Sequence, residues 1–162
     1  MLFLVGMPAS GKSTLARQLA QKWNWGSLDL DEEIEKKYLR TIPEIFAEEG
    51  ESQFRKIEAD VLRQIPIESQ KILATGGGTP CFHQNMEYML SVGKVIFLDV
   101  PLNTILERIL NQPTQRPLFA GKSKEEVKIF LEKLYAERLP FYQKAHLRIS
   151  HADELLLNSK IF

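Results

Sequence analysis

The segment that most constrains this chain is a glycine-rich loop near its N-terminus, Gly6-Met7-Pro8-Ala9-Ser10-Gly11-Lys12-Ser13. The loop fits the Walker A pattern, in which a strand leads into the glycines and a helix follows them directly. Apolar residues 2–5 precede it, and the apolar residues after it recur at helical spacing: Leu15, Ala16, Leu19 and Ala20. Strand, loop and helix in this order predict an α/β protein that holds a polyphosphate.

Backbone N–H groups in such a loop point inward, and the positive end of the helix dipole adds to their attraction for phosphate. Lys12 is expected to reach the β and γ phosphates of ATP as a catalytic residue, and Ser13 to ligate Mg²⁺. The residues expected to bind ATP here are Gly6, Ala9, Ser10, Gly11, Lys12, Ser13 and Thr14.

Length and composition favour one domain over residues 1–162, because 44% hydrophobic content suffices for one core. Acidic and basic residues balance at 21 each, which argues against nucleic-acid and membrane partners. The single cysteine, Cys81, cannot form an internal disulfide. Because there is also no basic leader and no apolar run near the ~20 residues of a membrane span, we expect a cytoplasmic protein.

Strand-like and helix-like stretches alternate along the chain. Helical spacing of apolar residues is clearest over 54–65 and 127–135. The alternation predicts a three-layer α/β/α fold of the P-loop NTPase type with a five-stranded parallel sheet. The expected strands are Leu2–Val5, Ser27–Leu30, Lys71–Ala74, Lys94–Leu98 and Leu147–Ile149.

The stretch from Asn111 to Ser123 breaks this alternation. It carries two prolines and a glycine between two predicted helices, and it includes Arg116. A long connection in a compact domain is usually functional, so we interpret 111–123 as a lid; a plain surface connector is the alternative.

Asp29 and Asp31 flank Leu30 at the end of the second predicted strand. Residues two apart on a strand share a side, so both carboxylates are expected to face one cleft beyond the carboxyl ends of the strands. Phosphoryl transfer to an alcohol needs a carboxylate near the metal and another that orients the attacking hydroxyl. We assign Asp29 to the metal and Asp31 to the hydroxyl. The alternative is that Asp31 only caps a helix.

Three more features follow in order. Arg55 and Glu58 lie three apart on a predicted helix, Thr75-Gly76-Gly77-Gly78 follows a predicted strand, and Arg116 precedes Arg138. The glycines provide room for a ligand to approach the backbone, and guanidinium groups bind carboxylates in bidentate fashion.

Together with the phosphate loop, these features resemble shikimate kinases in order and spacing, from Leu2 to about Ile149. The resemblance implies ATP-dependent phosphorylation of shikimate to shikimate 3-phosphate in aromatic amino acid (chorismate) biosynthesis. It implies that the acceptor is bound by Asp31, Arg55, Gly77, Gly78 and Arg138. The first two of these residues lie in an acceptor-binding segment of about 31–60.

The same resemblance implies that Arg116 reaches the transferring phosphate as a catalytic and ATP-binding residue. It also implies that Arg108 packs on adenine and that Glu58 supports Arg55. Departures from the family pattern are Pro8-Ala9 in the phosphate loop and Thr79-Pro80 after the glycines.

Three alternatives stay open. Asp99 follows an apolar run and could be a Walker B carboxylate at the metal. The enzyme could be another small P-loop kinase, such as a gluconate kinase. The chain could also be a nucleotide-binding regulator without catalysis, although Lys12, Ser13, Asp29 and Asp31 are all present. A GTPase is excluded because no Asn-Lys-x-Asp stretch occurs. We expect a monomer.

Overall fold

Parallel strands form the centre of the computed structural model, which describes residues 1–111 and 123–157. The five strands pair in the order β2-β3-β1-β4-β5, every pair parallel. Their bounds are β1 (Leu2–Val5), β2 (Gly26–Asp29), β3 (Lys71–Ala74), β4 (Lys94–Leu98) and β5 (Leu147–Ile149). The predicted strands are confirmed, except that β2 begins and ends one residue earlier than expected.

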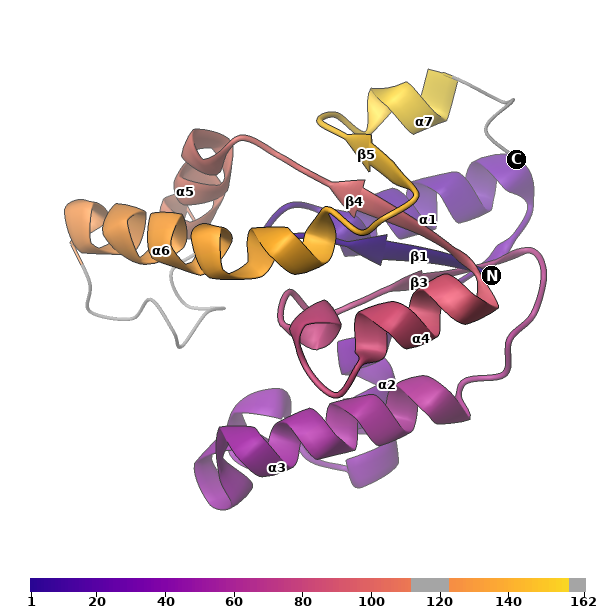
Figure 1. The fold of residues 1–162 in the computed structure, drawn as a ribbon, viewed down its shortest axis with the longest axis horizontal. Coiled ribbons are helices and arrows are strands. Elements are labelled where there is room, and N and C mark those ends of the chain that lie inside the picture. Colours follow the sequence, from indigo (N-terminus) through magenta and orange to yellow (C-terminus); the bar gives the residue numbers. More distant parts are fainter. Residues whose placement is uncertain (112–122, 158–162) are drawn as a thin grey trace.

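Helices cover both faces of this sheet (Figure 1). Their bounds are α1 (Lys12–Trp23), α2 (Leu30–Tyr38), α3 (Ile42–Gln64), the short 3₁₀ helix η1 (Thr79–Cys81), α4 (Asn85–Val92), α5 (Leu102–Asn111), α6 (Lys124–Tyr142) and α7 (Asp153–Leu157). Helices α1 and α7 lie side by side on one face, and α4 with α3 lies on the other. The three-layer prediction is therefore confirmed.

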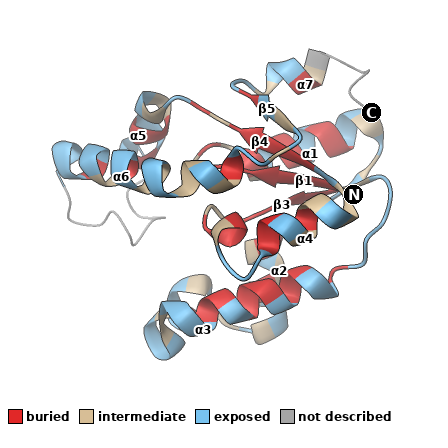
Figure 2. Cartoon of the chain, viewed as in Figure 1, coloured by how far each residue is buried: buried red, intermediate tan, exposed pale blue. Residues whose placement is uncertain are grey.

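The core lies where β1, β3 and β4 are covered on both faces. All of Leu2–Val5 and Val95–Leu98 are at most 2% exposed, and Figure 2 shows the buried residues gathered on these strands and on the inner sides of the helices. Strands buried on both faces read as continuous apolar runs. Because β1 and β3 are neighbours and run parallel, their carboxyl ends meet at one edge of the sheet, where the loops that follow them come together.

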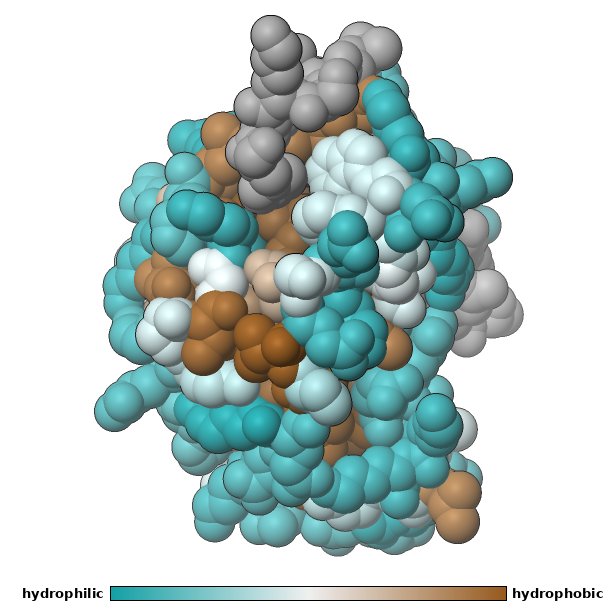
Figure 3. Space-filling view, turned by 90° about the vertical axis from the view of Figure 1, so that its right-hand side faces the viewer, coloured by the Kyte–Doolittle hydropathy of each residue, from teal (hydrophilic) through white to brown (hydrophobic). Residues whose placement is uncertain are grey.

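The opposite edge of the sheet lies at the amino ends of the strands. Figure 3 shows it as a mostly hydrophilic face with a small apolar centre. Among the described residues, no helix is long and apolar enough to cross a membrane.

Local signals explain where two long helices begin. Thr41 and Glu44 form a capping box at α3, and Ser123 and Glu126 form one at α6. Each pair satisfies backbone N–H groups that the first helical turn leaves without a partner. Within α3, Gly50 has a non-helical conformation with φ 76° and ψ 169°, so the helix consists of two stretches.

Candidate active site

The phosphate loop connects β1 to α1 in a conformation that depends on its glycines. Gly6 has φ 145°, and a Cβ atom there would lie 2.5 Å from the Leu98 carbonyl oxygen. Lys12 is buried, and its Nζ donates to the carbonyl oxygens of Gly6 at 2.9 Å and Met7 at 2.8 Å. The ammonium group is thus fixed against the inner side of the loop by local bonds.

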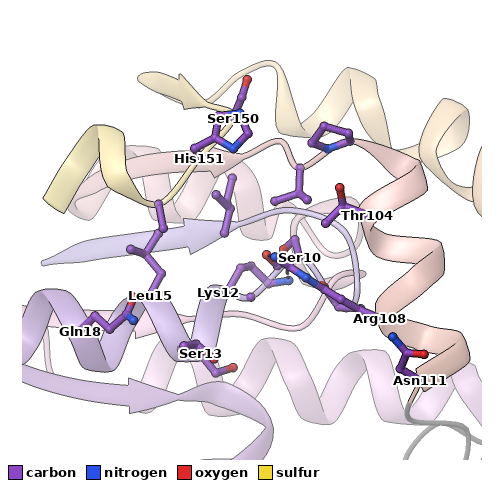
Figure 4. Close-up of a pocket in the computed structure, with 17 residues that line it drawn as sticks. Ser10, Lys12, Ser13, Leu15, Gln18, Thr104, Arg108, Asn111, Ser150 and His151 are labelled. Carbon is purple, nitrogen blue, oxygen red and sulfur yellow. Dashed lines mark hydrogen bonds between the residues drawn. The ribbon is translucent and has the colours of Figure 1, made fainter. Parts of the chain in front are cut away.

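A cavity of about 720 Å³ opens beside this loop (Figure 4). Arg108 extends from α5 to the loop, where its Nη1 donates to the carbonyl oxygens of Ala9 at 3.1 Å and Ser10 at 2.7 Å. Of the predicted ATP-binding residues that the structure describes, all but Gly6 line the cavity: Ala9, Ser10, Gly11, Lys12, Ser13, Thr14 and Arg108. Its size and position suit a nucleotide.

Other walls of the cavity come from residues that the sequence did not indicate. Thr104 lies on α5, whereas Ser150 and His151 follow β5, and Figure 4 shows these two above the phosphate loop. Their backbone N–H groups donate to Glu154 Oε1 at 2.7 and 2.9 Å, which fixes the loop that carries them. No sequence motif marks them, because they reach the cavity only through the fold.

Ser13 and Asp29 meet below the loop. Ser13 Oγ donates to Asp29 Oδ2 at 2.5 Å, and Asp29 Oδ1 accepts the backbone N–H of Asp31 at 3.0 Å. Asp29 is both the last residue of β2 and the N-cap of α2. A hydroxyl beside a carboxylate is an oxygen donor set that fits a divalent cation which keeps waters and phosphate oxygens as its other ligands.

The expected strand geometry of Asp29 and Asp31 is wrong. The strand ends at Asp29, and Asp31 lies in the first turn of α2. The Asp29 cap starts the helix at once, so helix geometry rather than strand alternation directs Asp31. The alternative was close to the outcome, with Asp29 rather than Asp31 as the capping residue.

Asp31 has an unusual environment. Burial raises the pKa of its carboxyl to about 7, and the negative charges of Asp29 and Glu58 add to this rise against the opposing charge of Lys12. A Cβ atom at Gly76 would lie 3.1 Å from Asp31 Oδ1 and 3.0 Å from Glu58 Oε1. A carboxyl group with a pKa near neutrality can accept a proton from a substrate hydroxyl.

Arg55 is buried on α3, and its guanidinium lies against Gly78 of the predicted acceptor site. Its Nη1 donates to Glu58 Oε2 at 3.0 Å, and Thr79 Oγ1 donates to Glu58 Oε1 at 2.6 Å. The predicted support of Arg55 by Glu58 is confirmed as a contact. The off-pattern Thr79 has a structural explanation, because its hydroxyl fixes the second Glu58 oxygen.

Arg138 approaches the same region from α6. Its Nη1 is buried and has no hydrogen-bond partner within residues 1–111 and 123–157. Tyr142, one turn further along α6, donates from its hydroxyl to the Gly77 carbonyl oxygen at 2.5 Å. Burial raises the pKa of the Tyr142 phenol, against the charge of Arg138. The arginine therefore brings positive charge and an available donor to the glycine loop.

Gly77 and Gly78 are required by close packing within the protein, a role that the sequence did not indicate. A Cβ atom at Gly77 would lie 2.6 Å from Pro8 Cδ, and one at Gly78 would lie 2.6 Å from Arg55 Nη2. The space that side chains would take is thus filled by the protein itself. These glycines allow the phosphate loop and Arg55 to pack closely against the segment after β3.

Two other candidates have clear outcomes. Asp99 accepts from Arg148 Nε at 2.7 Å and from the Tyr135 hydroxyl at 3.1 Å. Its carboxylate is engaged there, so the Walker B alternative gains no support. Arg116 and residues 112–122 of the predicted lid lie outside the described residues.

The phosphate loop adjoins the cavity on one side and the segment with Gly77 on another. An enzyme that moves a phosphoryl group between two small molecules needs a donor and an acceptor site in contact. On a five-stranded parallel sheet with a Walker A loop, this arrangement defines the class of small P-loop kinases.

Comparison with known proteins narrows the class. The family model described as shikimate kinase matches residues 8–159. The shikimate kinase of Bacteroides thetaiotaomicron is 38% identical over 154 residues, covering 95% of this chain and 87% of that protein. The enzyme of Phocaeicola vulgatus is 40% identical with the same coverage. This chain belongs to the shikimate kinase family.

Solved structures of shikimate kinases have the same fold as this chain. A 1.7 Å crystal structure of the Bacteroides thetaiotaomicron enzyme superposes with a TM-score of 0.89 at 36% identity, covering 93% of this chain and 86% of that one. The Acinetobacter baumannii shikimate kinase in complex with shikimate gives 0.85 at 35% identity, covering 99% and 94%.

Proposed function

We propose that this protein transfers the γ-phosphoryl group of ATP to a hydroxyl of shikimate, giving shikimate 3-phosphate for aromatic amino acid biosynthesis. The observation that carries the proposal is the contact between the phosphate loop and a site that contains Asp31, Arg55 and Arg138. Membership of the shikimate kinase family indicates that shikimate is the acceptor.

On the donor side, the backbone N–H groups of the phosphate loop, to which Pro8 contributes none, would bind the phosphates of ATP, and Lys12 would neutralise their charge. Arg108 would stabilise the loop through Ala9 and Ser10 and pack on the adenine, because its guanidinium lines the 720 Å³ cavity. Arg116 is proposed to reach the transferring phosphate from the lid at 111–123. Lid closure would exclude water that otherwise hydrolyses ATP.

On the acceptor side, Arg55 and Arg138 would bind the carboxylate of shikimate, and the Gly77 and Gly78 backbone would contact its ring. Asp31 would accept the proton of the attacking hydroxyl. Its environment supports this role, because a pKa of about 7 leaves enough carboxylate to act as a base and enough basicity to take the proton.

Mg²⁺ is the proposed cofactor, with Ser13 and Asp29 on its protein side. These two residues would hold the ion, which would supply positive charge that neutralises the phosphates of ATP. The protein's own part is to position these two oxygen donors, which the cap of α2 by Asp29 achieves.

The remaining proposals concern the whole chain. Residues 1–162 are proposed to form a single kinase domain with its acceptor segment at about 31–60. We propose a cytoplasmic monomer that acts on small molecules and binds neither nucleic acid nor membrane, given equal numbers of acidic and basic residues.

A coupled assay of ADP release with MgATP tests the proposal, with shikimate, gluconate or no acceptor in parallel reactions. ADP release is expected in the reaction with shikimate and in neither of the other two. Turnover with gluconate would retain a kinase with a different acceptor. No ADP release with either acceptor, together with measurable ATP binding, would favour a regulator that has lost catalysis.

A further inference from the structure

Two carboxylates of the protein itself bind the guanidinium group of Arg55. Glu58 takes Nη1, as described above, and Glu51 Oε1 accepts from Nε at 3.3 Å and from Nη2 at 3.1 Å. Gly78 lies against the guanidinium, and the Phe54 and Phe82 rings lie 5.1 and 4.6 Å from its carbon. A ligand carboxylate that binds the Nε–Nη2 edge must therefore replace Glu51.

The two partners of Arg55 differ sharply in burial. The Glu58 side chain is 1% exposed and also accepts from Thr79, so its removal from Arg55 would leave a buried charge without compensation. The Glu51 side chain is 59% exposed and can exchange its bond to Arg55 for water. Glu58 is the permanent partner, and Glu51 is the replaceable one.

Gly50 places Glu51 in position. Its φ of 76° interrupts α3 immediately before Glu51, which thus begins the second helical stretch. A Cβ atom at Gly50 would have no neighbour within 4 Å, so the backbone conformation alone requires glycine there. An acid in the first turn, four residues before a basic residue, is the favourable arrangement for a helical ion pair.

We infer that Glu51 determines acceptor selectivity by holding the Nε–Nη2 edge of Arg55 until the acceptor's carboxylate replaces it. The inference rests on the proposed function, in which Arg55 binds that carboxylate. One carboxylate replaces another, so the charge balance around Arg55 is preserved. A neutral polyol cannot make this exchange, because it would leave the guanidinium edge without an anionic partner. Glu51 thus weakens acceptor binding somewhat and favours acceptors with a carboxylate.

Calorimetric titration of the full chain with shikimate, without nucleotide, tests this inference. In Glu51→Gln, the Kd for shikimate is expected to fall about 2- to 5-fold, the range of an exposed ion pair. The KM for shikimate should fall by a similar factor, while kcat and the KM for ATP stay unchanged. Glu51→Asp keeps the charge but shortens the reach, so it should also tighten binding.

Glu49→Gln is the matched control. It removes the same charge two residues away, from a side chain that pairs with Arg40 at 2.5 Å rather than with Arg55, and it should leave the Kd unchanged. An unchanged or higher Kd in Glu51→Gln, with wild-type turnover intact, would overturn the inference alone. Wild-type protein that neither binds nor phosphorylates shikimate would overturn the proposed function and this inference with it.

Discussion

The two sides of the site are assembled from different kinds of segment. The donor side is dominated by one continuous stretch, residues 6–14, whose backbone is proposed to do most of the binding. The acceptor side takes Asp31, Arg55, Gly77 and Arg138 from elements spread over more than half of the chain. Lys12 on the donor side bonds to its own loop, whereas Arg55 on the acceptor side bonds to carboxylates.

This difference teaches where tolerance is to be expected. A backbone site tolerates changes of side chain as long as the loop keeps its conformation, since the N–H groups remain. A side-chain site depends on every partner that holds each functional group, because a buried charge without its partner is costly. Four substitutions, in order of decreasing expected effect, measure this contrast.

Lys12→Met should have the largest effect. Lys12 is the side chain proposed to neutralise the charge of the phosphates, so we expect kcat to fall by about 10³-fold or more. Steady-state ADP release measures this loss. Arg17→Met on the same helix is the control, because Arg17 forms an exposed ion pair with Glu32, and it should stay within about 2-fold of wild type. A Lys12 variant with a tenth of wild-type activity would contradict the assigned role.

Asp31→Asn should lower kcat by about 10²-fold or more, since the proton acceptor is lost. In the wild type, activity should rise with pH through an apparent pKa near 7, as Asp31 becomes ionised. The residual activity of the variant should lack this step. A pH profile of kcat/KM for both proteins is the measurement, and an identical profile would argue against Asp31 as the base.

The same variant should be more stable than the wild type above pH 7. The folded-state pKa of Asp31 is raised from 3.8 to about 7, so ionisation opposes folding. This penalty is absent below about pH 4 and is complete above about pH 7. The asparagine side chain carries no charge, so the free energy of unfolding should increase by roughly 1–4 kcal/mol at pH 8 and change little at pH 4. Denaturant titrations at the two pH values test the sign.

Arg55→Lys should act mainly on the acceptor. Lysine keeps the charge beside the buried Glu58 but cannot bind a carboxylate in bidentate fashion. We expect the KM for shikimate to rise about 10- to 100-fold and the KM for ATP to change less than about 3-fold. Equal effects on both substrates would contradict the assignment. The melting temperature, measured in parallel, separates lost binding from lost folding.

His151→Ala should have the smallest effect. Its ring lines one wall of the donor cavity, so its loss should raise the KM for ATP about 2- to 10-fold and leave the KM for shikimate unchanged. Initial rates at varied ATP measure this effect. A shift in the shikimate KM instead would show that the loop after β5 communicates with the acceptor side.

The fold and the donor side could be predicted from sequence because their signals are local. Short apolar runs mark each strand, and the Walker A residues are contiguous. Arg108 was assigned through family resemblance, and the cavity lies against it. Ser150 and His151 could not be found, because only the return of β5 to the sheet edge brings them near the loop.

The acceptor side was harder to predict because its geometry depends on packing. The spacing of Arg55 and Glu58 indicated their contact correctly, whereas the contact of Glu51 with Arg55, at a spacing of four residues, is known only from the structure. The carboxylates at 29 and 31 were expected to share a side through strand alternation, because the sequence did not show that the strand ends at Asp29 and that this residue caps the next helix. The sequence also did not indicate that Pro8 and Arg55 pack against two of the glycines at 76–78.

The contact between Pro8 and Gly77 has a consequence for how such a sequence can diverge. The proline ring lies where any side chain at position 77 would begin. A larger residue at 77 would have to displace the backbone at position 8 as well as the proline ring, since a Cβ atom there would also lie 2.9 Å from the Pro8 nitrogen. A substitution beside Arg55 and Arg138 would therefore deform the phosphate loop, although 69 positions separate the two residues along the chain.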